Sequence, residues 1–233
     1  MKVLFFLAAF TCFSLPLFAQ HQMSVSLNSG IGKSALITEL ESESKMMTNI
    51  SDKYSTSYNA QLNYSFQKNH WIAETGLAYN LIKGSTQETF KVYDWYNQYQ
   101  YHTYAAHETR RAHYLTIPLM IHYKFNKLSI GAGLFAALLL TDYFFIQFYR
   151  DEIPDGFQQG GNRLKNFDIG ANAKVHFSLN EKFGLQALIN YGFSDVSNGT
   201  QNGAVYQILQ LNEASNRQLK NRQLLVGITY RIF

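Results

Sequence analysis

The chain has 233 residues, with 20 basic and 16 acidic side chains and a formal net charge of +4, a balance too mild to indicate nucleic-acid binding. Aromatic residues make up 15% of the sequence, and proline occurs only three times. The single cysteine, Cys12, lies in the N-terminal apolar segment, so the remaining chain has neither a disulfide framework nor a thiolate site.

The first 19 residues have the organisation of a secretory signal peptide. Lys2 provides a positive start, residues 3–18 are almost wholly apolar, and Ala19 is the small residue before a cleavage point. The alternative is a transmembrane anchor, but the apolar run is short for one and polar sequence follows it directly. We therefore predict a signal peptide at residues 1–19 and a single domain at residues 20–233.

The predicted domain consists of eight segments in which apolar and polar side chains alternate. A period of two is typical of β-strands with one apolar face. In one segment, for example, Leu115, Ile117 and Leu119 alternate with Thr116. The predicted strands span residues 23–32, 54–67, 71–81, 114–124, 128–140, 167–177, 183–191 and 224–232.

The connections between these segments are alternately short and long. Short turns lie at residues 67–70, 125–127 and 179–182, and long connections lie at residues 33–53, 83–111, 141–166 and 194–221. This alternation is typical of outer-membrane barrels, which have tight periplasmic turns and long external loops. Within the second long connection, the alternation of Tyr99 and Tyr101 favours strands that continue outward as a hairpin with a turn near residues 94–97.

Aromatic side chains on the apolar faces gather next to the short turns, as expected of the girdle at a membrane interface. They are Tyr64, Phe66, Trp71, Tyr123, Phe125, Phe177, Phe183 and Tyr230. We therefore predict an all-β fold: an eight-stranded antiparallel up-and-down transmembrane β-barrel, exported to the outer membrane of a Gram-negative bacterium.

Pro118 lies in the middle of the fourth predicted strand. Proline donates no backbone hydrogen bond, and a closed barrel has no edge strand on which to place it. Its position in the alternation points it toward the lumen. We expect a β-bulge at Pro118; the alternative is a weakened seam that opens sideways to lipid.

The tract YLTIPLMIHYKF at residues 114–125, followed by a tight turn and LSIGAGLFAALLL at residues 128–140, resembles PorT-like outer-membrane β-barrel proteins. The resemblance implies an integral outer-membrane protein without catalytic residues, and some family members assist a dedicated protein-secretion machinery. Such chains often end in Tyr-x-Phe with both aromatics facing lipid. Here Tyr230 and Ile232 share that face, so Phe233 either lies past the last paired residue or follows a bulge.

Five inward-facing side chains are expected in the lower lumen. Glu74, His122, Lys174 and Gln186 lie at similar heights, and His176 lies just below them. An eight-stranded barrel has room only for its own side chains, and buried charges must pair. We therefore expect Glu74 and Lys174 to form a plug. The alternative, a catalytic acid–base pair, lacks a nucleophile and an entry path.

Basic residues also gather where the predicted strands meet the long connections. This set, which we call the basic belt, comprises Lys83, Arg110, Arg111, Arg163, Lys165, Arg217 and Arg222. Cations at the height of the outer-leaflet headgroups are suited to lipopolysaccharide phosphates, although ordinary loop solvation explains them equally well.

Other motifs carry little chemistry. The tract GIGKSA at residues 30–35 contains only the end of a phosphate loop, and the histidines His102, His107 and His113 are not in metal-ligand register. The tract PDG at residues 154–156 is typical of a turn. We assign no catalytic, metal-binding or cofactor-binding residue.

The sequence favours a non-enzymatic accessory or interaction protein of the cell envelope, with protein secretion implied by the family resemblance. The alternatives are an outer-membrane lipid-modifying enzyme and a narrow pore for small solutes. The expected partners are outer-membrane lipid, lipopolysaccharide and other envelope or secretion proteins, and no nucleic acid.

Overall fold

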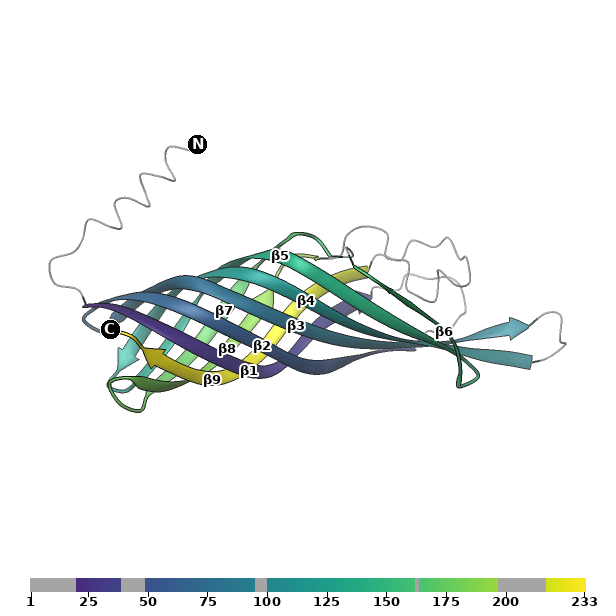
Figure 1. The fold of residues 1–233 in the computed structure, drawn as a ribbon, viewed down its shortest axis with the longest axis horizontal. Coiled ribbons are helices and arrows are strands. Elements are labelled where there is room, and N and C mark those ends of the chain that lie inside the picture. Colours follow the sequence, from purple (N-terminus) through teal and green to yellow (C-terminus); the bar gives the residue numbers. More distant parts are fainter. Residues whose placement is uncertain (1–19, 39–48, 95–99, 162–163, 197–216) are drawn as a thin grey trace, which may run out of the picture.

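The computed structural model describes residues 20–38, 49–94, 100–161, 164–196 and 217–233 (Figure 1). The predicted signal peptide lies outside these ranges. The strands are β1 (Gln20–Thr38), β2 (Asn49–Lys68), β3 (Trp71–Asp94), β4 (Gln100–Phe125), β5 (Leu128–Arg150), β6 (Ile153–Gly160), β7 (Phe167–Ser178), β8 (Phe183–Gly192) and β9 (Arg217–Arg231). Within the described ranges, no helix is long and apolar enough to cross a membrane.

Eight of these strands form a closed antiparallel ring. Its order is β1-β2-β3-β4-β5-β7-β8-β9, and β9 pairs with β1 to close it. The predicted eight-stranded up-and-down barrel is thus confirmed. The remaining strand, β6, pairs with β5 and lies beyond the barrel, toward the right of Figure 1.

The barrel wall has the two faces that the alternation predicts. On β4, Leu119 and Ile121 are 65% and 61% exposed on the outside, whereas Met120 and His122 are almost completely buried on the inside. Most exposed large side chains on the ring strands are aliphatic or aromatic. An apolar outer face of this kind is suited to lipid, and a polar inner face to a closed lumen.

The short turns at the periplasmic end are tight and joined to one another. Asn69 and Asn126 have left-handed backbones (φ 56° and 52°), which asparagine tolerates better than most residues. Backbone hydrogen bonds link neighbouring turns, from Lys124 N to His70 O and from Ser178 N to Lys127 O, both at 2.8 Å. These bonds make the periplasmic rim a continuous structure.

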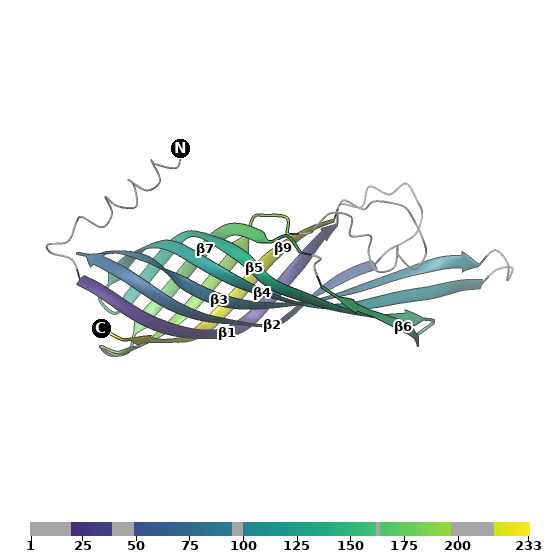
Figure 2. The same cartoon turned by 45° about the horizontal axis from the view of Figure 1, so that its top comes forward.

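At the opposite end, all four predicted long connections are partly strands. The outward hairpin predicted within residues 83–111 is confirmed, because β3 and β4 stay paired as far as Asp94 and Gln100 (Figure 2). Strand β5 also continues outward and turns into β6. The turn expected at residues 154–156 is wrong, since Asp151 and Glu152 adopt the left-handed backbone (φ 46° and 68°) and form the turn.

The bulge predicted at Pro118 is also wrong. The registers of β4 against both β3 and β5 are continuous through this residue. Pairing with β3 is merely interrupted opposite Pro118, because proline has no N–H. Its carbonyl accepts a hydrogen bond from the Thr75 hydroxyl at 2.9 Å. Pro118 itself is buried and faces the lumen, as its position predicts.

The C-terminus has the hydrogen-bond pattern of a bulge. Ile232 N donates to Met23 O at 2.8 Å, and Met23 N donates to Phe233 O at 3.1 Å. Two residues of the last strand therefore lie opposite one residue of β1. Of the two explanations for Phe233, this pattern favours the bulge, and the Phe233 side chain is 64% exposed.

Candidate functional site

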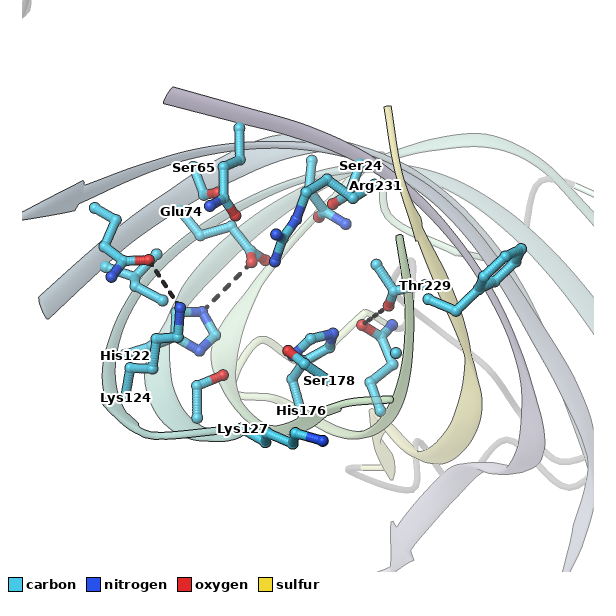
Figure 3. Close-up of a pocket in the computed structure, with 18 of the residues that line it drawn as sticks. Ser24, Ser65, Glu74, His122, Lys124, Lys127, His176, Ser178, Thr229 and Arg231 are labelled. Carbon is cyan, nitrogen blue, oxygen red and sulfur yellow. Dashed lines mark hydrogen bonds and ion pairs between the residues drawn. The ribbon is translucent and has the colours of Figure 1, made fainter. Parts of the chain in front are cut away.

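The lower lumen holds a cluster of ionisable side chains from three strands (Figure 3). Lys174 Nζ on β7 donates a short hydrogen bond to Glu74 Oε1 on β3, and His122 Nε2 on β4 lies 3.6 Å from Glu74 Oε2. The three side chains are 4%, 11% and 2% exposed, respectively. One carboxylate therefore lies between a lysine and an imidazole in a site with little access to water.

Two glycines make room for the imidazoles of this cluster. A Cβ on Gly131, which pairs with His122, would lie 2.3 Å from His122 Nδ1. A Cβ on Gly184 would lie 2.2 Å from His176 Nε2. Both contacts are far below van der Waals distance, so the small residues on β5 and β8 determine where the rings lie.

Above this cluster, a chain of amides crosses the lumen. Gln186 Nε2 donates to Asn28 Oδ1, Asn28 to Asn59, Asn59 to Asn80, and Asn80 to the Thr116 hydroxyl, all within 2.6–2.8 Å. The chain joins side chains from β8, β1, β2, β3 and β4. Sequence analysis included Gln186 but missed the asparagines, which could have been found because they all occupy inward positions of the alternation.

The upper lumen is closed by an apolar cluster. It contains Ile82, Ala112, Tyr114, Phe135, Ala137, Leu164 and Val196, all at most 8% exposed. Beside it, Asn221 Nδ2 donates to the Tyr114 hydroxyl at 3.2 Å and to Asp168 Oδ2 at 3.0 Å. A cavity of about 20 Å³ remains at this level. The lumen is thus filled at three successive levels.

The five predicted lumen residues all line one cavity at the periplasmic end, which we call the periplasmic cup. Gln186 accepts from the Thr229 hydroxyl at 2.9 Å, and His176 lies on the opposite wall from Glu74 in Figure 3. Several serines also line the cup, but among the described residues no hydrogen bond joins a serine hydroxyl to either histidine. Over the same ranges, no group of three His, Cys, Asp or Glu side chains is able to hold a metal ion.

Three belt residues lie at the outer limit of the apolar wall. Lys83 Nζ is 5.5 Å from the Tyr58 ring centroid, and Arg222 Cζ is 4.7 Å from that of Tyr191. Arg222 Nη2 also donates to the Tyr191 hydroxyl at 3.0 Å. Arg111 is exposed and pairs with Lys83 across β3 and β4. Cations above tyrosines are an arrangement suited to a membrane interface.

The other belt residues are placed differently. Arg110 faces inward and bonds Glu108 through its Nε, so it does not face the headgroups as predicted. Lys165 Nζ donates to the backbone carbonyl of Asp195 at 3.0 Å. Arg163 lies outside the described residues, as does the side chain of Arg217.

Comparison with known proteins places the chain among barrels of the outer membrane. A family model described as an outer membrane protein β-barrel domain matches residues 18–198, most of the chain. No curated protein matches significantly.

Solved structures similar to the chain include three surface or outer-membrane proteins. Neisserial surface protein A has 7% identity and a TM-score of 0.38, with 92% of this chain and 99% of that chain covered. Ail, the attachment invasion locus protein of Yersinia pestis, has 11% identity and a TM-score of 0.38, with 93% and 100% covered. OprG from Pseudomonas aeruginosa has 11% identity and a TM-score of 0.39, with 91% and 95% covered.

Proposed function

The chain belongs to the family of outer-membrane proteins that share this β-barrel domain, and from that premise we propose that it is a non-enzymatic accessory or interaction protein of the cell envelope. The observation that carries this proposal is the contrast between a filled lumen and the external sheet. We give this name to the extensions of β3 (residues 84–94), β4 (residues 100–110) and β5 (residues 141–150) together with β6. A lumen closed at three levels offers no path for solutes. Loops and hairpins on a rigid barrel are where binding surfaces usually lie.

The external sheet exposes large apolar side chains beyond the ring of eight strands. Ile153 and Phe157 on β6 are 69% and 66% exposed, and the Phe157 ring stacks on Phe145 with centroids 6.0 Å apart. Exposed apolar groups next to one another favour a protein-binding surface. We assign to this surface another envelope protein and, from the PorT-like resemblance of residues 114–140, a role in protein secretion.

Variants of the external sheet test this proposal. Ile153→Ser with Phe157→Ser should reduce the envelope proteins that crosslink to the barrel and lower the amount of secreted protein in the culture fluid. Asp155→Ser, an exposed position on the same strand, is the matched control. Heat-modifiable migration on a detergent gel should show that all variants fold.

Two outcomes would contradict the proposal. Steady single-channel conductance in planar bilayers, unchanged by the β6 variants, would identify a pore. Turnover of outer-membrane lipid by the purified protein would identify an enzyme.

A specific observation also supports lipopolysaccharide as a partner. On β3 and β9, the first outward-facing residue beyond the external end of the apolar face is basic. This residue is Lys83, next to Leu81, on β3, and Arg222, next to Leu224, on β9. Both cations lie over tyrosine rings. The triple change Lys83→Gln, Arg111→Gln and Arg222→Gln should lower the lipopolysaccharide that co-purifies with the barrel.

The matched control for this experiment is Lys68→Gln, an exposed cation at the periplasmic end. If the triple variant co-purifies with as much lipopolysaccharide as the unaltered protein, the cations of the basic belt are simply solvated and do not bind lipopolysaccharide.

A further inference from the structure

The periplasmic cup is a blind cavity with a rigid mouth. Its volume is about 70 Å³, room for about five to seven water-sized positions on the measure of 10–15 Å³ for each. The backbone bonds between neighbouring turns surround the mouth, including the one from Arg231 N to Lys182 O at 2.7 Å. The amide chain that begins at Gln186 closes the floor. A group that enters from the periplasm therefore stops inside the cup.

The charges around this cup are unbalanced. Five cations line it, Lys124, Lys127, Lys174, Lys182 and Arg231, against the two carboxylates of Glu74 and Glu181. Lys174 is buried and Lys124 and Arg231 are half-buried, whereas Lys127, Lys182 and Glu181 are exposed at the mouth. Solvent therefore screens the excess of three positive charges only in part, and the cations repel one another more strongly than in bulk water. An anion inside the cup would remove this repulsion.

Most of these cations have no partner that would neutralise them. Lys174 bonds Glu74, and Lys124 Nζ donates to the neutral Gln67 amide at 3.2 Å. Within the described part of the chain, the side chains of Lys127, Lys182 and Arg231 make neither an ion pair nor a hydrogen bond. Figure 3 shows Arg231 and Lys127 on opposite sides of the cavity. Their placement is that of a clamp around a central group.

The neutral groups of the cup are also suited to an oxyanion. His122 is 2% exposed, and its Nε2 lies 3.6 Å from Glu74 Oε2 but makes no hydrogen bond with the described residues. The hydroxyls of Ser24, Ser65, Ser129 and Ser178 line the same cavity. Ammonium, guanidinium and hydroxyl donors together bind phosphate oxygens with short, charge-assisted hydrogen bonds.

We propose that the periplasmic cup binds a phosphate group that enters from the periplasm. The cations at its mouth, Lys127, Lys182 and Arg231, hold the phosphate oxygens, and the Glu74–Lys174 pair lines the wall of the cavity. This site lies at the end of the barrel opposite the basic belt and the external sheet. Phosphate binding at the cup can therefore be confirmed or refuted independently of the function proposed for those surfaces. Free phosphate and the headgroup phosphate of an inner-leaflet phospholipid share this chemistry.

The test uses the full barrel, purified in an uncharged maltoside detergent and titrated with inorganic phosphate by calorimetry. We expect saturable binding that weakens at least tenfold in the triple variant Lys127→Gln, Lys182→Gln and Arg231→Gln. The control triple variant Lys53→Gln, Lys68→Gln and Arg150→Gln removes the same charge outside the cup and the basic belt and should bind like the unaltered protein. Heat-modifiable migration establishes folding, and the single variants replace the triple one if it does not fold.

A second titration with short-chain phosphatidylglycerol distinguishes the two sources. Binding of the lipid but not of inorganic phosphate, lost in the cup variant, would assign the site to a phospholipid headgroup. Binding of inorganic phosphate that the cup variant loses would assign it to free phosphate. The proposal is overturned if the unaltered protein binds neither probe, or if the cup and control variants bind equally well.

Discussion

The contact between Glu74 and Lys174 makes a quantitative prediction about barrel stability. The perturbation is Glu74→Gln and Lys174→Met, made singly and together. Two unit charges about 4 Å apart attract by about 4 kcal/mol at an effective dielectric constant of 20. Because both side chains are nearly buried, at 11% and 4% exposed, removal of one partner leaves a charge without compensation, which costs about 3–5 kcal/mol.

The two single changes should not cost the same. After Lys174→Met, Glu74 still has His122 Nε2 at 3.6 Å from its second oxygen. After Glu74→Gln, Lys174 faces a neutral amide, and no other carboxylate pairs with it among the described residues. We therefore expect Glu74→Gln to lower the free energy of unfolding more than Lys174→Met does. The double variant should lose less free energy of unfolding than the two single variants lose together.

The assay is urea unfolding of the barrel in phospholipid vesicles. The coupling energy is calculated from the free energies of unfolding of the unaltered protein, the two single variants and the double variant. We expect a coupling energy of about 2–3 kcal/mol. This is the part of the stability lost in the single variants that the double variant regains, because it leaves no buried charge unpaired. The control pair is Lys165 and Asp195, 3.5 Å apart but 49% and 31% exposed, where about 0.2–1 kcal/mol is expected. Additive changes at Glu74 and Lys174 would refute the reasoning.

Three further substitutions test other parts of the wall and lumen. Pro118→Ala supplies an N–H that faces β3, and hydrogen exchange should show it protected; exchange as fast as in an exposed loop would be evidence against that orientation. Gly131→Ala should lower the free energy of unfolding by about 1–3 kcal/mol through its clash with His122, and His122→Ala should relieve most of this loss. Asn59→Leu leaves Asn28 Nδ2 without its acceptor and Asn80 Oδ1 without its donor and should cost about 2–4 kcal/mol, whereas a loss below 0.5 kcal/mol would show that the chain is dispensable.

The barrel wall could be predicted from the sequence because its two faces lie in different environments. Lipid on one face and a polar lumen on the other impose a period of two, which continues for ten residues or more in most ring strands. The same constraint predicted the inward orientation of Pro118 correctly. It did not predict how the missing N–H is accommodated, because that depends on a hydroxyl of the neighbouring strand, Thr75.

Outside the membrane this constraint ends, and there the sequence is a poorer guide. Beyond the ring the alternation weakens while backbone pairing continues. The tract IPDGFQQG at residues 153–160 has the proline and glycine of a loop, yet it forms β6 because β5 offers an unpaired edge. The turn moves to Asp151 and Glu152, which sequence analysis treated as ordinary loop residues.

Contacts across the lumen are the hardest to predict, because they depend on how far each strand is staggered against its neighbours. Heights counted from the short turns suggested that Glu74 and Lys174 lie level, and the structure brings them into contact across 100 residues of sequence. The same count has no reference point above the barrel. Arg110 was therefore assigned to the basic belt at the height of the headgroups, although in the structure it lies on an inward position of β4 beside Glu108. Counting residues from a short turn gives the height of a side chain only as long as the strand remains part of the barrel wall. For this reason the residues of the periplasmic cup could be predicted from the sequence, whereas those of the external sheet could not.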